Sequence, residues 1–417
     1  EALIRQILHG LGYFRREFGT RPTVCWLPDV FGYNAGLPQI LVGCGLRSFW
    51  TWKLHWQSRN SFPYHLFWWQ GVDGSRVLAH IPKLGGGGYN GTPSPQQLAT
   101  AWQTYLQKGT YDEQLFPFGY GDGGGGVNEE MLEFAQRARA FPGLPACRQG
   151  TAEDFFEEVH ATHPDLPTWV GELYLETHRG TLTSQARIKR DNRRCELTLR
   201  GAEIAGVIAR RLGVDVDLSP LRAAWEKTLL HQFHDILPGS SIGEVYQEAA
   251  QDHAQVLATA EEVRNRALAT IIGDAKDTLR FAVLNSLSWE RDGVVEIEAP
   301  DVGETVVGMM HGHPVPAQVV AKDGKRMTVL VAAEKVPAMG GALLELALDA
   351  PLPSLVHATD RTLENQFYRL ELDQAGEILS LWDKRAEREV IAAGERGNQL
   401  LLFQDGPERE AAWNVHW

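Results

Sequence analysis

The hydrophobic pattern of this chain changes twice, and each change limits the folds that the chain can adopt. From residue 1 to about 167, helical patterns alternate with short apolar runs typical of buried strands. From about 168 to 275, three long amphipathic segments follow one another, at 187–212, 221–234 and 242–272. From about 276 onward, strand-like runs are separated by Gly, Pro and Asp. With 417 residues, the chain is long enough for a multidomain protein.

The three regions predict three architectures. For 1–167 we expect a β/α domain, with a parallel sheet or barrel covered by helices. For 168–275 we expect a three-helix bundle, and for 276–417 an antiparallel β domain of sandwich type. In the first region, helices are expected over 2–18, 37–42, 94–108 and 127–140, and strands over 23–27, 77–81 and 115–120. In the third region, strands are expected over 280–285, 294–298, 326–332, 342–348 and 367–372.

Composition and charge exclude some classes of function. The net charge of −13 argues against a nucleic-acid partner, which requires a basic face. No apolar run reaches the roughly 20 residues of a membrane span, and no signal peptide precedes the first helical pattern. The four cysteines are far apart, which favours buried free thiols over disulfides or a zinc finger. We therefore expect a cytoplasmic protein with neither a membrane nor a nucleic-acid partner.

The most informative segment runs from Cys25 to Ile40 and reads CWLPDVFGYNAGLPQI. It combines a buried strand with a carboxylate, Asp29, just past the strand end. In β/α barrels that edge carries catalytic residues. An Asp in this position is also common as a turn or helix-capping residue. The whole string resembles the nucleophile motif of the family 38 glycoside hydrolases, which are zinc-dependent retaining α-mannosidases, and the resemblance puts Asp29 at the nucleophile position.

A second segment, LLHQFHDILPGSS, runs from Leu229 to Ser241. His231 and His234 are one helical turn apart and could share a face as metal ligands, or one could be packed and the other exposed. The segment resembles the second histidine motif of the same family. That resemblance implies His234 as a zinc ligand, together with Asp29, and Asp235 as a residue that binds a substrate hydroxyl or supports the ligand.

A third segment, FGYGDGGGG, runs from Phe118 to Gly126. A glycine run after a strand could bind phosphate, but it lacks both the Lys-Ser/Thr and the GxGxxG spacing of nucleotide sites. It resembles the cytosolic and bacterial branch of the mannosidase family. The resemblance implies Asp122 as the general acid/base and Tyr120 as a substrate contact.

A fourth segment, WVGELYLETHRGTLTSQ, runs from Trp169 to Gln185. Its Glu172, Glu176 and His178 could form a cluster of salt bridges between domains or line the sugar site, and the resemblance favours His178 as a substrate contact. The chain is also rich in tryptophan between residues 50 and 69. Those side chains could stack on sugar rings, although a Trp-rich core is the simpler interpretation.

The resemblance covers nearly the whole chain and implies a specific chemistry. The first domain would be a seven-stranded-barrel-like β/α catalytic domain, zinc the metal and a mannose-containing oligosaccharide the substrate, with self-association into a homo-oligomer left open. The family's first zinc motif, an N-terminal His-x-Asp, is missing, so we expect both ends of the chain to be incomplete. His163-Pro164-Asp165 has the right letters but occurs too late in the sequence, and we interpret it as an interdomain turn.

Two other functions are compatible with the same residues. A zinc-dependent amide or ester hydrolase on a similar barrel would use Asp29 as a metal ligand only. A carbohydrate-binding protein with a degenerate site would keep the pocket and lose the chemistry.

Overall fold

The computed structural model describes residues 1–84, 88–122, 124–162, 164–273, 279–303, 305–349, 352–404 and 410–415. The chain divides into two compact units. The first contains Glu1–Arg200, Ser219–Glu261 and Pro407–Trp417, and the second contains Gly201–Leu218 and Glu262–Gly406. The domain limits predicted near residues 167 and 275 stay predictions. The predicted turn at His163 concerns a residue outside the described ranges.

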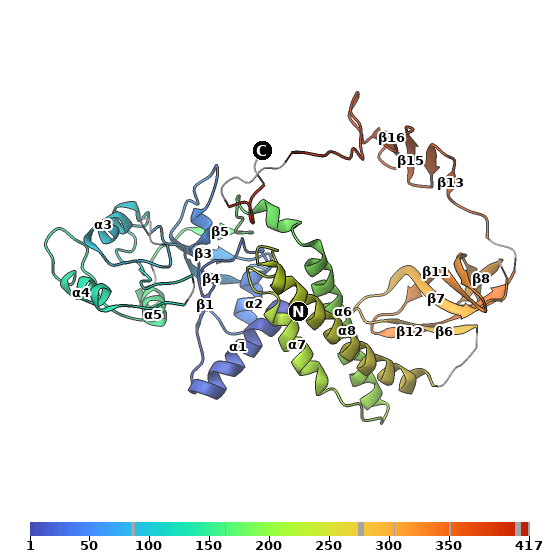
Figure 1. Ribbon diagram of the computed structural model, residues 1–417, viewed down its shortest axis with the longest axis horizontal. Coiled ribbons are helices and arrows are strands. Elements are labelled where there is room, and N and C mark those ends of the chain that lie inside the picture. The colour runs from blue at the N-terminus through green and yellow to red at the C-terminus, as the bar shows by residue number, and fades with distance from the viewer. Residues whose placement is uncertain are drawn as a thin grey trace. The chain divides into compact units, whose positions relative to one another are not determined.

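A five-stranded sheet organises the first unit (Figure 1). Its strands lie in the order β1-β2-β4-β3-β5, and all neighbouring pairs are parallel except β3 with β4. That antiparallel pair is closed by a tight turn in which the N–H of Gly71 donates to the carbonyl of Ser75 at 2.9 Å. The expected parallel sheet thus contains one hairpin, and closure into a seven-stranded barrel stays a prediction. The strands are β1 (Val24–Trp26), β2 (Ser48–Trp50), β3 (Leu66–Gln70), β4 (Arg76–His80) and β5 (Thr168–Val170).

Two helices of this region begin at residues whose side chains cap them. Pro95 opens α3, and the side chain of Ser94 caps that helix through the N–H of Gln97. Asn128 caps α4 in the same way through the N–H of Met131 at 2.9 Å. The helices of this region are α1 (Ala2–Phe18), α2 (Leu37–Gly43), α3 (Pro95–Thr104), α4 (Glu129–Arg137) and α5 (Ala152–Thr162), with short 3₁₀ turns η1 (Lys53–His55) and η2 (Arg179–Leu182).

One predicted strand of this region is absent from the described residues, and several elements were not predicted. Residues 115–120 form no strand, and only an isolated bridge joins Phe118 to Gly91. Pro117 has no N–H to donate to a ladder, which is why this apolar run stays a loop. The elements that were not foreseen are β2, β3, β5 and α5, and the three strands among them have only three to five residues each.

The sheet is buried on both faces. Phe49, Trp69 and Ala79 enter one apolar cluster with residues of α2, and Trp50 and Leu78 enter another with residues of α5. Alternate residues of a strand point to opposite faces, so Leu78 and Ala79 serve different clusters. Trp50 and Trp69 are therefore core residues, as the simpler interpretation of the Trp-rich stretch held.

Three long helices follow the sheet: α6 (Ala186–Arg211), α7 (Pro220–Leu230) and α8 (Gly243–Ile272), as predicted. Helix α7 ends at Leu230, four residues earlier than expected. In the part that belongs to the first unit, the Cys195 thiol of α6 contacts the carbonyl of His253 in α8 at 3.7 Å. Helix α1 lies against α7, where the side chain of Gln6 donates to the carbonyl of Leu229 at 2.8 Å.

The second unit contains an antiparallel β sandwich. One sheet has the order β10-β11-β7 and the other β6-β12-β8-β9, and buried side chains such as Val329, Val331 and Leu344 fill a shared core. A separate five-stranded sheet, β13 to β17, follows in order. The first seven strands are β6 (Arg280–Asn285), β7 (Arg291–Pro300), β8 (Val306–Met310), β9 (His313–Val315), β10 (Ala317–Asp323), β11 (Arg326–Val336) and β12 (Gly340–Leu348). The others are β13 (His357–Ala358), β14 (Thr362–Glu364), β15 (Tyr368–Leu372), β16 (Ile378–Asp383) and β17 (Arg388–Glu389).

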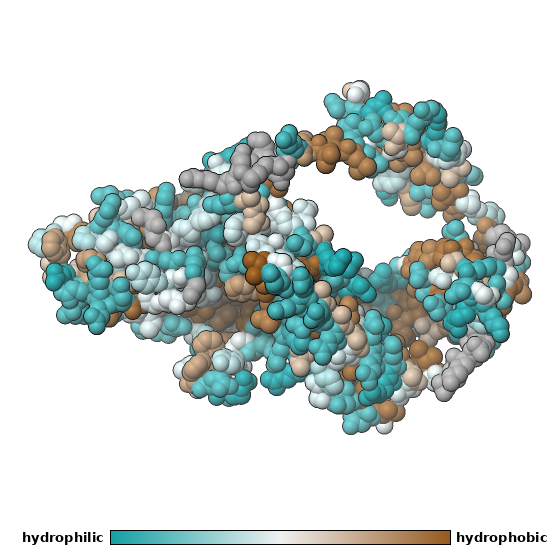
Figure 2. All heavy atoms as spheres, in the orientation of Figure 1, coloured by the Kyte–Doolittle hydropathy of each residue, from teal (hydrophilic) through white to brown (hydrophobic). Residues whose placement is uncertain are grey.

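Three further findings concern the helices, the thiols and one exposed apolar run. None of the helices in the described ranges is both long and apolar enough to cross a membrane. All four cysteines are free, but Cys25 and Cys147 are only partly buried. The run Leu400–Phe403 exposes four consecutive apolar side chains, visible as a brown strip in the space-filling view (Figure 2). Contiguous exposed apolar residues are typical of surfaces that contact other protein.

Two buried histidines, His65 and His80, lie where β3 and β4 meet the segment that follows α3, and the half-buried His55 of η1 lies beside them, with its Nε2 3.0 Å from the carbonyl oxygen of Ile81. The Nδ1–H of His80 donates to the carbonyl of His65 at 2.8 Å, and its Nε2 accepts from the N–H of Leu115 at 3.1 Å. Burial lowers the pKa of His80 to about 4, and burial likewise lowers the pKa values of His55 and His65, to about 4 and about 3. All three rings are therefore neutral near pH 7.

This cluster predicts acid sensitivity of the first unit. His80 titrates near 6.5 when unfolded and near 4 when folded, so its contribution to stability is complete above pH 6.5 and declines as the pH falls towards 4. Each such group can contribute up to about 1.4 kcal/mol per pH unit. We expect His80→Gln to flatten the pH dependence of the denaturation midpoint, followed by tryptophan fluorescence between pH 7 and pH 5. His357→Gln, at an exposed position, should leave it unchanged, and an unaltered slope in His80→Gln would contradict the prediction.

Candidate active site

Asp29 lies at the carboxyl end of β1, in a loop that neighbouring backbone groups hold in place. The N–H of Leu27 donates to the carbonyl of Trp50 at 3.1 Å, and the N–H of Lys53 donates to the carbonyl of Pro28 at 3.2 Å. The buried hydroxyl of Tyr33 donates to the carbonyl of Leu27 at 2.7 Å. These contacts tie the loop after β1 to the loop after β2, so Asp29 projects from a fixed backbone.

The glycine of this motif is required by its backbone. Gly32 has a φ of 105°, and a Cβ there would lie 3.4 Å from the carbonyl oxygen of Leu173 and from the N–H of Leu175. A side chain would be strained in this conformation and crowded against the neighbouring segment. The close approach brings residues 173–178 beside the loop that carries Asp29.

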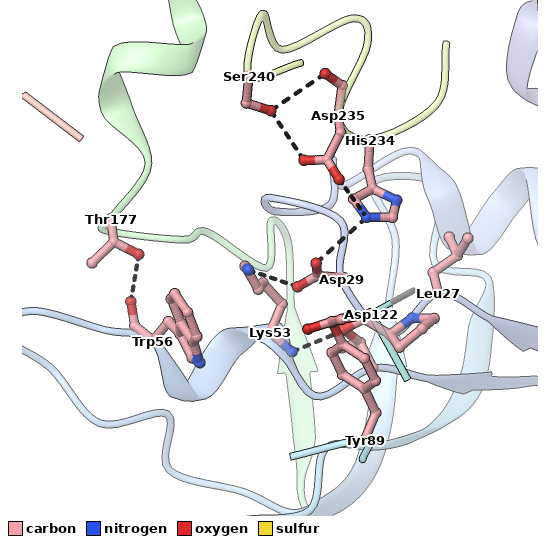
Figure 3. A network of polar contacts seen from close by, with 12 residues as sticks. Leu27, Asp29, Lys53, Trp56, Tyr89, Asp122, Thr177, His234, Asp235 and Ser240 are labelled. Carbon is pink, nitrogen blue, oxygen red and sulfur yellow. Dashed lines mark hydrogen bonds and ion pairs between the residues drawn. The ribbon is translucent and has the colours of Figure 1, made fainter. Parts of the chain in front are cut away.

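The carboxylate of Asp29 lies between two nitrogen groups (Figure 3). Its Oδ1 is 2.6 Å from the Nζ of Lys53, and its Oδ2 is 3.4 Å from the Nε2 of His234. Burial by itself raises the pKa of Asp29, but the contacts with His234 and Lys53 outweigh burial, and the pKa lies below its ordinary value. Asp29 is therefore ionised at neutral pH.

Lys53 is the site residue that the sequence analysis missed. It follows β2, and only 5% of its side chain is exposed. Its Nζ lies 4.2 Å from the centre of the Trp56 ring and 5.0 Å from that of Phe31. A buried ammonium requires an anionic partner, and Asp29 supplies it. A lysine within an aromatic run was the signal available in the sequence, although its partner was not.

His234 and Asp235 lie in the turn that follows α7. The Nε2 of His234 is 3.5 Å from the Oδ2 of Asp235, whose Oδ1 accepts from the hydroxyl of Ser240 at 3.0 Å. Gly239, with a φ of 96°, allows this turn to pass close to Ser184, whose carbonyl oxygen would lie 2.7 Å from an added Cβ. The turn thus directs both side chains of the His-Asp pair towards Asp29 (Figure 3).

Of the two alternatives for His231 and His234, the structure supports the one in which His231 is packed and His234 is more exposed. The helix ends before them, and the carbonyl of Asp235 accepts from the hydroxyl of Ser241 at 2.6 Å instead of continuing the helix. His231 is buried, and its Nε2 lies 3.0 Å from the carboxylate of Asp252 in α8. His231 therefore joins α7 to α8, and only His234 faces Asp29.

Asp122 reaches the same region through Tyr89. The hydroxyl of Tyr89 donates to the Oδ1 of Asp122 at 2.7 Å. Burial raises the pKa of Tyr89, and the carboxylates of Asp122 and Asp29 raise it further, so this phenol lies near both acids. Asp122 has a φ of 42°, a left-handed conformation that Asp tolerates better than most residues. Tyr120, the predicted substrate contact, is 61% exposed.

His178 forms part of an aromatic wall beside Lys53. Its ring centre lies 4.6 Å from that of Phe31 and 5.5 Å from that of Trp56. Burial and, to a smaller extent, the charge of Lys53 lower the pKa of His178 to about 4, so the ring is neutral at pH 7. Its buried Nδ1 has no hydrogen-bond partner among the described residues.

Two donors in this site fit a zinc ion. The separation of 3.4 Å between Asp29 Oδ2 and His234 Nε2 is about that of two ligands on a tetrahedral zinc, whose bonds are about 2.0–2.1 Å long. These two donors do not make a complete site, since no group of three or more His, Cys, Asp or Glu within the described ranges could hold a metal. The pair therefore fits part of a zinc site.

The comparisons with known proteins agree with the sequence motifs. Residues 1–172 match the N-terminal domain of the glycosyl hydrolases family 38, residues 176–271 the α-mannosidase middle domain, and residues 363–416 the family 38 C-terminal domain. The chain belongs to glycosyl hydrolase family 38. Its architecture is accordingly the multidomain one of that family, with N-terminal, middle and C-terminal domains.

Individual relatives of this family 38 chain match it over almost its full length. Alpha-mannosidase 2C1 of Homo sapiens is 36% identical over 425 residues, which cover 100% of this chain and 38% of the relative. Alpha-mannosidase G of Dictyostelium discoideum is 32% identical and covers 97% of this chain and 40% of the relative. The chain thus spans about two fifths of the length of these proteins.

A solved structure extends the comparison to the fold. The crystal structure of an alpha-mannosidase from Enterococcus faecalis aligns with a TM-score of 0.69 at 17% identity. The alignment covers 93% of this chain and 50% of that one. At this identity the likeness shows a shared fold.

The buried ion pair of this family 38 site predicts a measurable shift. Replacing Lys53 by Met removes a contact and a positive charge that both lower the pKa of Asp29, so that pKa should rise. Lys53→Arg keeps the positive charge and should leave the pKa nearer its wild-type value. Carboxyl-carbon NMR titration of Asp29 in the three proteins measures the effect. A pKa equal in wild type and Lys53→Met would refute the inferred coupling.

Proposed function

We propose that this chain carries the catalytic site of a retaining α-mannosidase, which removes terminal α-linked mannose from oligosaccharides or glycoconjugates. The observation that carries the proposal is the ionised carboxylate of Asp29, held between Lys53 and His234 at the carboxyl end of a strand. Membership of family 38 and the names of the relatives, which are alpha-mannosidases, support the substrate class.

In the proposed first step, an oxygen of Asp29 attacks the anomeric carbon of mannose as the bond to the leaving oxygen breaks. Asp122 donates its proton to that leaving oxygen, so the released alcohol is neutral. The products of this step are a glycosyl ester on Asp29 and an ionised Asp122. Retaining glycosidases use two carboxyl groups in this way.

In the second step, the roles of the acid reverse. Asp122 accepts a proton from water as the water oxygen attacks the anomeric carbon, and the ester bond to Asp29 breaks. Mannose is released with its original configuration, and both carboxyl groups return to their starting states. Lys53 would favour departure of the carboxylate, because its ammonium stabilises the negative charge that returns to Asp29.

Zinc is part of this proposal. Asp29 and His234 would hold the ion, with Asp235 supporting His234 or binding a substrate hydroxyl. Bound zinc would neutralise charge near the nucleophile and bind sugar hydroxyls. His178 and Trp56 would form the wall beside the sugar, and Tyr120 stays a predicted substrate contact. The barrel-like domain, the cytoplasmic location and self-association also remain predictions.

The role of Asp29 is tested by its removal. Asp29→Ala should retain less than about 1% of wild-type turnover of an aryl α-mannoside, because loss of a covalent catalyst typically costs several orders of magnitude. Asp165→Ala, at an exposed position, should behave as wild type. Mass spectrometry of a peptide trapped with a fluorinated mannoside should show the sugar on Asp29. Full labelling elsewhere would exclude Asp29 as the nucleophile, and an amide or ester hydrolase would not be labelled.

The role of Asp122 is tested by the leaving group. A general acid contributes most when the departing oxygen is basic. Asp122→Ala should therefore slow hydrolysis of a mannose disaccharide at least about tenfold more than hydrolysis of a dinitrophenyl mannoside. Measured kcat/KM values for a series of aryl mannosides give the slope. Equal losses along the series would move the assignment to another carboxyl group, with Glu172 the next to be replaced.

The metal is tested by binding rather than by turnover. His234→Ala should weaken zinc binding, measured by calorimetry, by at least about tenfold, since it removes one of two protein donors. Zinc should also raise the melting temperature of the wild type and not of the variant. His357→Ala is the matched control, because that histidine is exposed on β13. Zinc affinity unchanged in His234→Ala would show that the ligands lie elsewhere.

A further inference from the structure

Residues 173–178 connect two loops that carry the proposed catalytic groups. On one side, Tyr33 and Leu173 exchange backbone hydrogen bonds of 2.9 and 3.0 Å beside the loop of Asp29. On the other side, the hydroxyl of Thr177 donates to the carbonyl of Trp56 at 2.7 Å. The segment ends at His178, whose ring lies beside those of Phe31 and Trp56.

Glu176 makes the strongest of these connections. Its Oε2 accepts from three successive backbone N–H groups, those of Ser58 at 2.9 Å, Arg59 at 2.6 Å and Asn60 at 3.2 Å. The side chain of Ser58 donates to the same oxygen at 3.3 Å, and the side-chain amide of Asn60 donates to Oε1 at 2.5 Å. Five hydrogen bonds thus join one carboxylate to one tripeptide.

The side chain of Gln57 forms a second attachment between residues 57–60 and residues 173–178. Its amide donates to the carbonyl of Tyr174 and its oxygen accepts from the N–H of Glu176, both at 2.7 Å. With Glu176, this amide fixes residues 57–60 immediately after Trp56. The salt-bridge interpretation considered for Glu176 is therefore replaced by a contact with backbone donors.

A carboxylate suits this role better than any neutral side chain. Successive N–H groups that point to one spot form a concave anion site. The pKa of Glu176 is lowered to about 2, mainly by the hydrogen bond from the N–H of Arg59 and then by that from the side chain of Asn60. The carboxyl group is therefore ionised at neutral pH. A glutamine at position 176 would have an NH₂ group in place of one carboxylate oxygen, and this group cannot accept a hydrogen bond from the surrounding donors.

We propose that Glu176 is a positioning residue, which holds loop 57–60 so that Trp56 and Lys53 keep their places beside Asp29. Trp56 lies one residue before this loop, and its ring contacts the ammonium of Lys53 at 4.2 Å and the ring of His178 at 5.5 Å. Release of the loop would free the indole, and with it one side of the lysine. The effect on turnover rests on the proposed mannosidase function, whereas the effect on the loop does not.

The loop itself is tested without any assay of turnover. Trypsin cleaves after Arg59, whose N–H is bound by Glu176, so Glu176→Ala should be cut at that bond at least about tenfold faster than wild type. Added formate, a small carboxylate that fits the vacated anion site, should slow this cleavage, and chloride at equal ionic strength should not. Glu157→Ala, exposed on α5, is the matched control. Equal cleavage of Glu176→Ala and wild type would overturn the proposal.

The positioning role is tested by kinetics on an aryl α-mannoside. Glu176→Ala and Glu176→Gln should each lose at least about tenfold in kcat/KM, because small displacements of binding groups are costly. Formate should restore part of this loss in Glu176→Ala and not in Glu176→Gln, where the amide still fills the site. Asn60→Ala removes one contact to Glu176 from the opposite side and should give a smaller loss of kcat/KM. This variant tests the same contact where the Glu176 variants do not fold.

The outcomes separate the two proposals. Faster cleavage at Arg59 with full turnover would overturn the positioning role, as would a loss of turnover that formate does not restore. A wild-type protein without mannosidase activity would overturn the proposed function, while cleavage at Arg59 and its response to formate would still decide whether Glu176 holds the loop.

Discussion

The buried contact between Lys53 and Asp29 is the constraint on which the rest of the site depends. An ammonium and a carboxylate lose hydration when they are buried, and they stay charged only if their separation is short and fixed. The distance of 2.6 Å meets that condition. It is maintained by the backbone, since Pro28 accepts from the N–H of Lys53 and thereby ties the two loops together. Aromatic rings of Trp56 and Phe31 complete the environment of the cation.

The loops around this contact are ordered by side chains that bind backbone groups. Tyr33 donates to the carbonyl of Leu27, Thr177 to that of Trp56, and Ser241 to that of Asp235. Regular secondary structure contributes little here, because the strands β1 and β2 have three residues each. Hydroxyl and carboxylate groups in the motifs therefore hold the loops in place, in addition to any chemical role. This explains why the motifs extend well beyond the few residues that would touch a sugar.

The sequence predicted the long elements and the motif residues better than it predicted the connections. The helices α6 and α8 and the strand at Val24 were evident from periodicity and from a Pro-Asp stop. The strand at Ser48–Trp50 was hidden because three residues carry no periodicity. The strand predicted at 115–120 does not form, because Pro117 cannot donate a hydrogen bond to a neighbouring strand. Asp29 and His234 were found through their motifs, and the structure places their side chains 3.4 Å apart. Lys53 was not foreseen, and Glu176 was noticed without its partners, because the partners of both residues are set by folding and not by spacing.

The distance along the chain between the partners of Asp29 has a consequence for synthesis. Lys53 lies 24 residues after Asp29 in the sequence, whereas His234 lies 205 residues after it. At about 5–20 residues per second, the ribosome reaches Lys53 within roughly five seconds of Asp29 and His234 only after roughly 10–40 seconds. During that interval the nascent chain can already give the Asp29 carboxylate a counterion from its own loop. The β/α region can thus form around a neutralised acid before the turn that carries the histidine has left the ribosome.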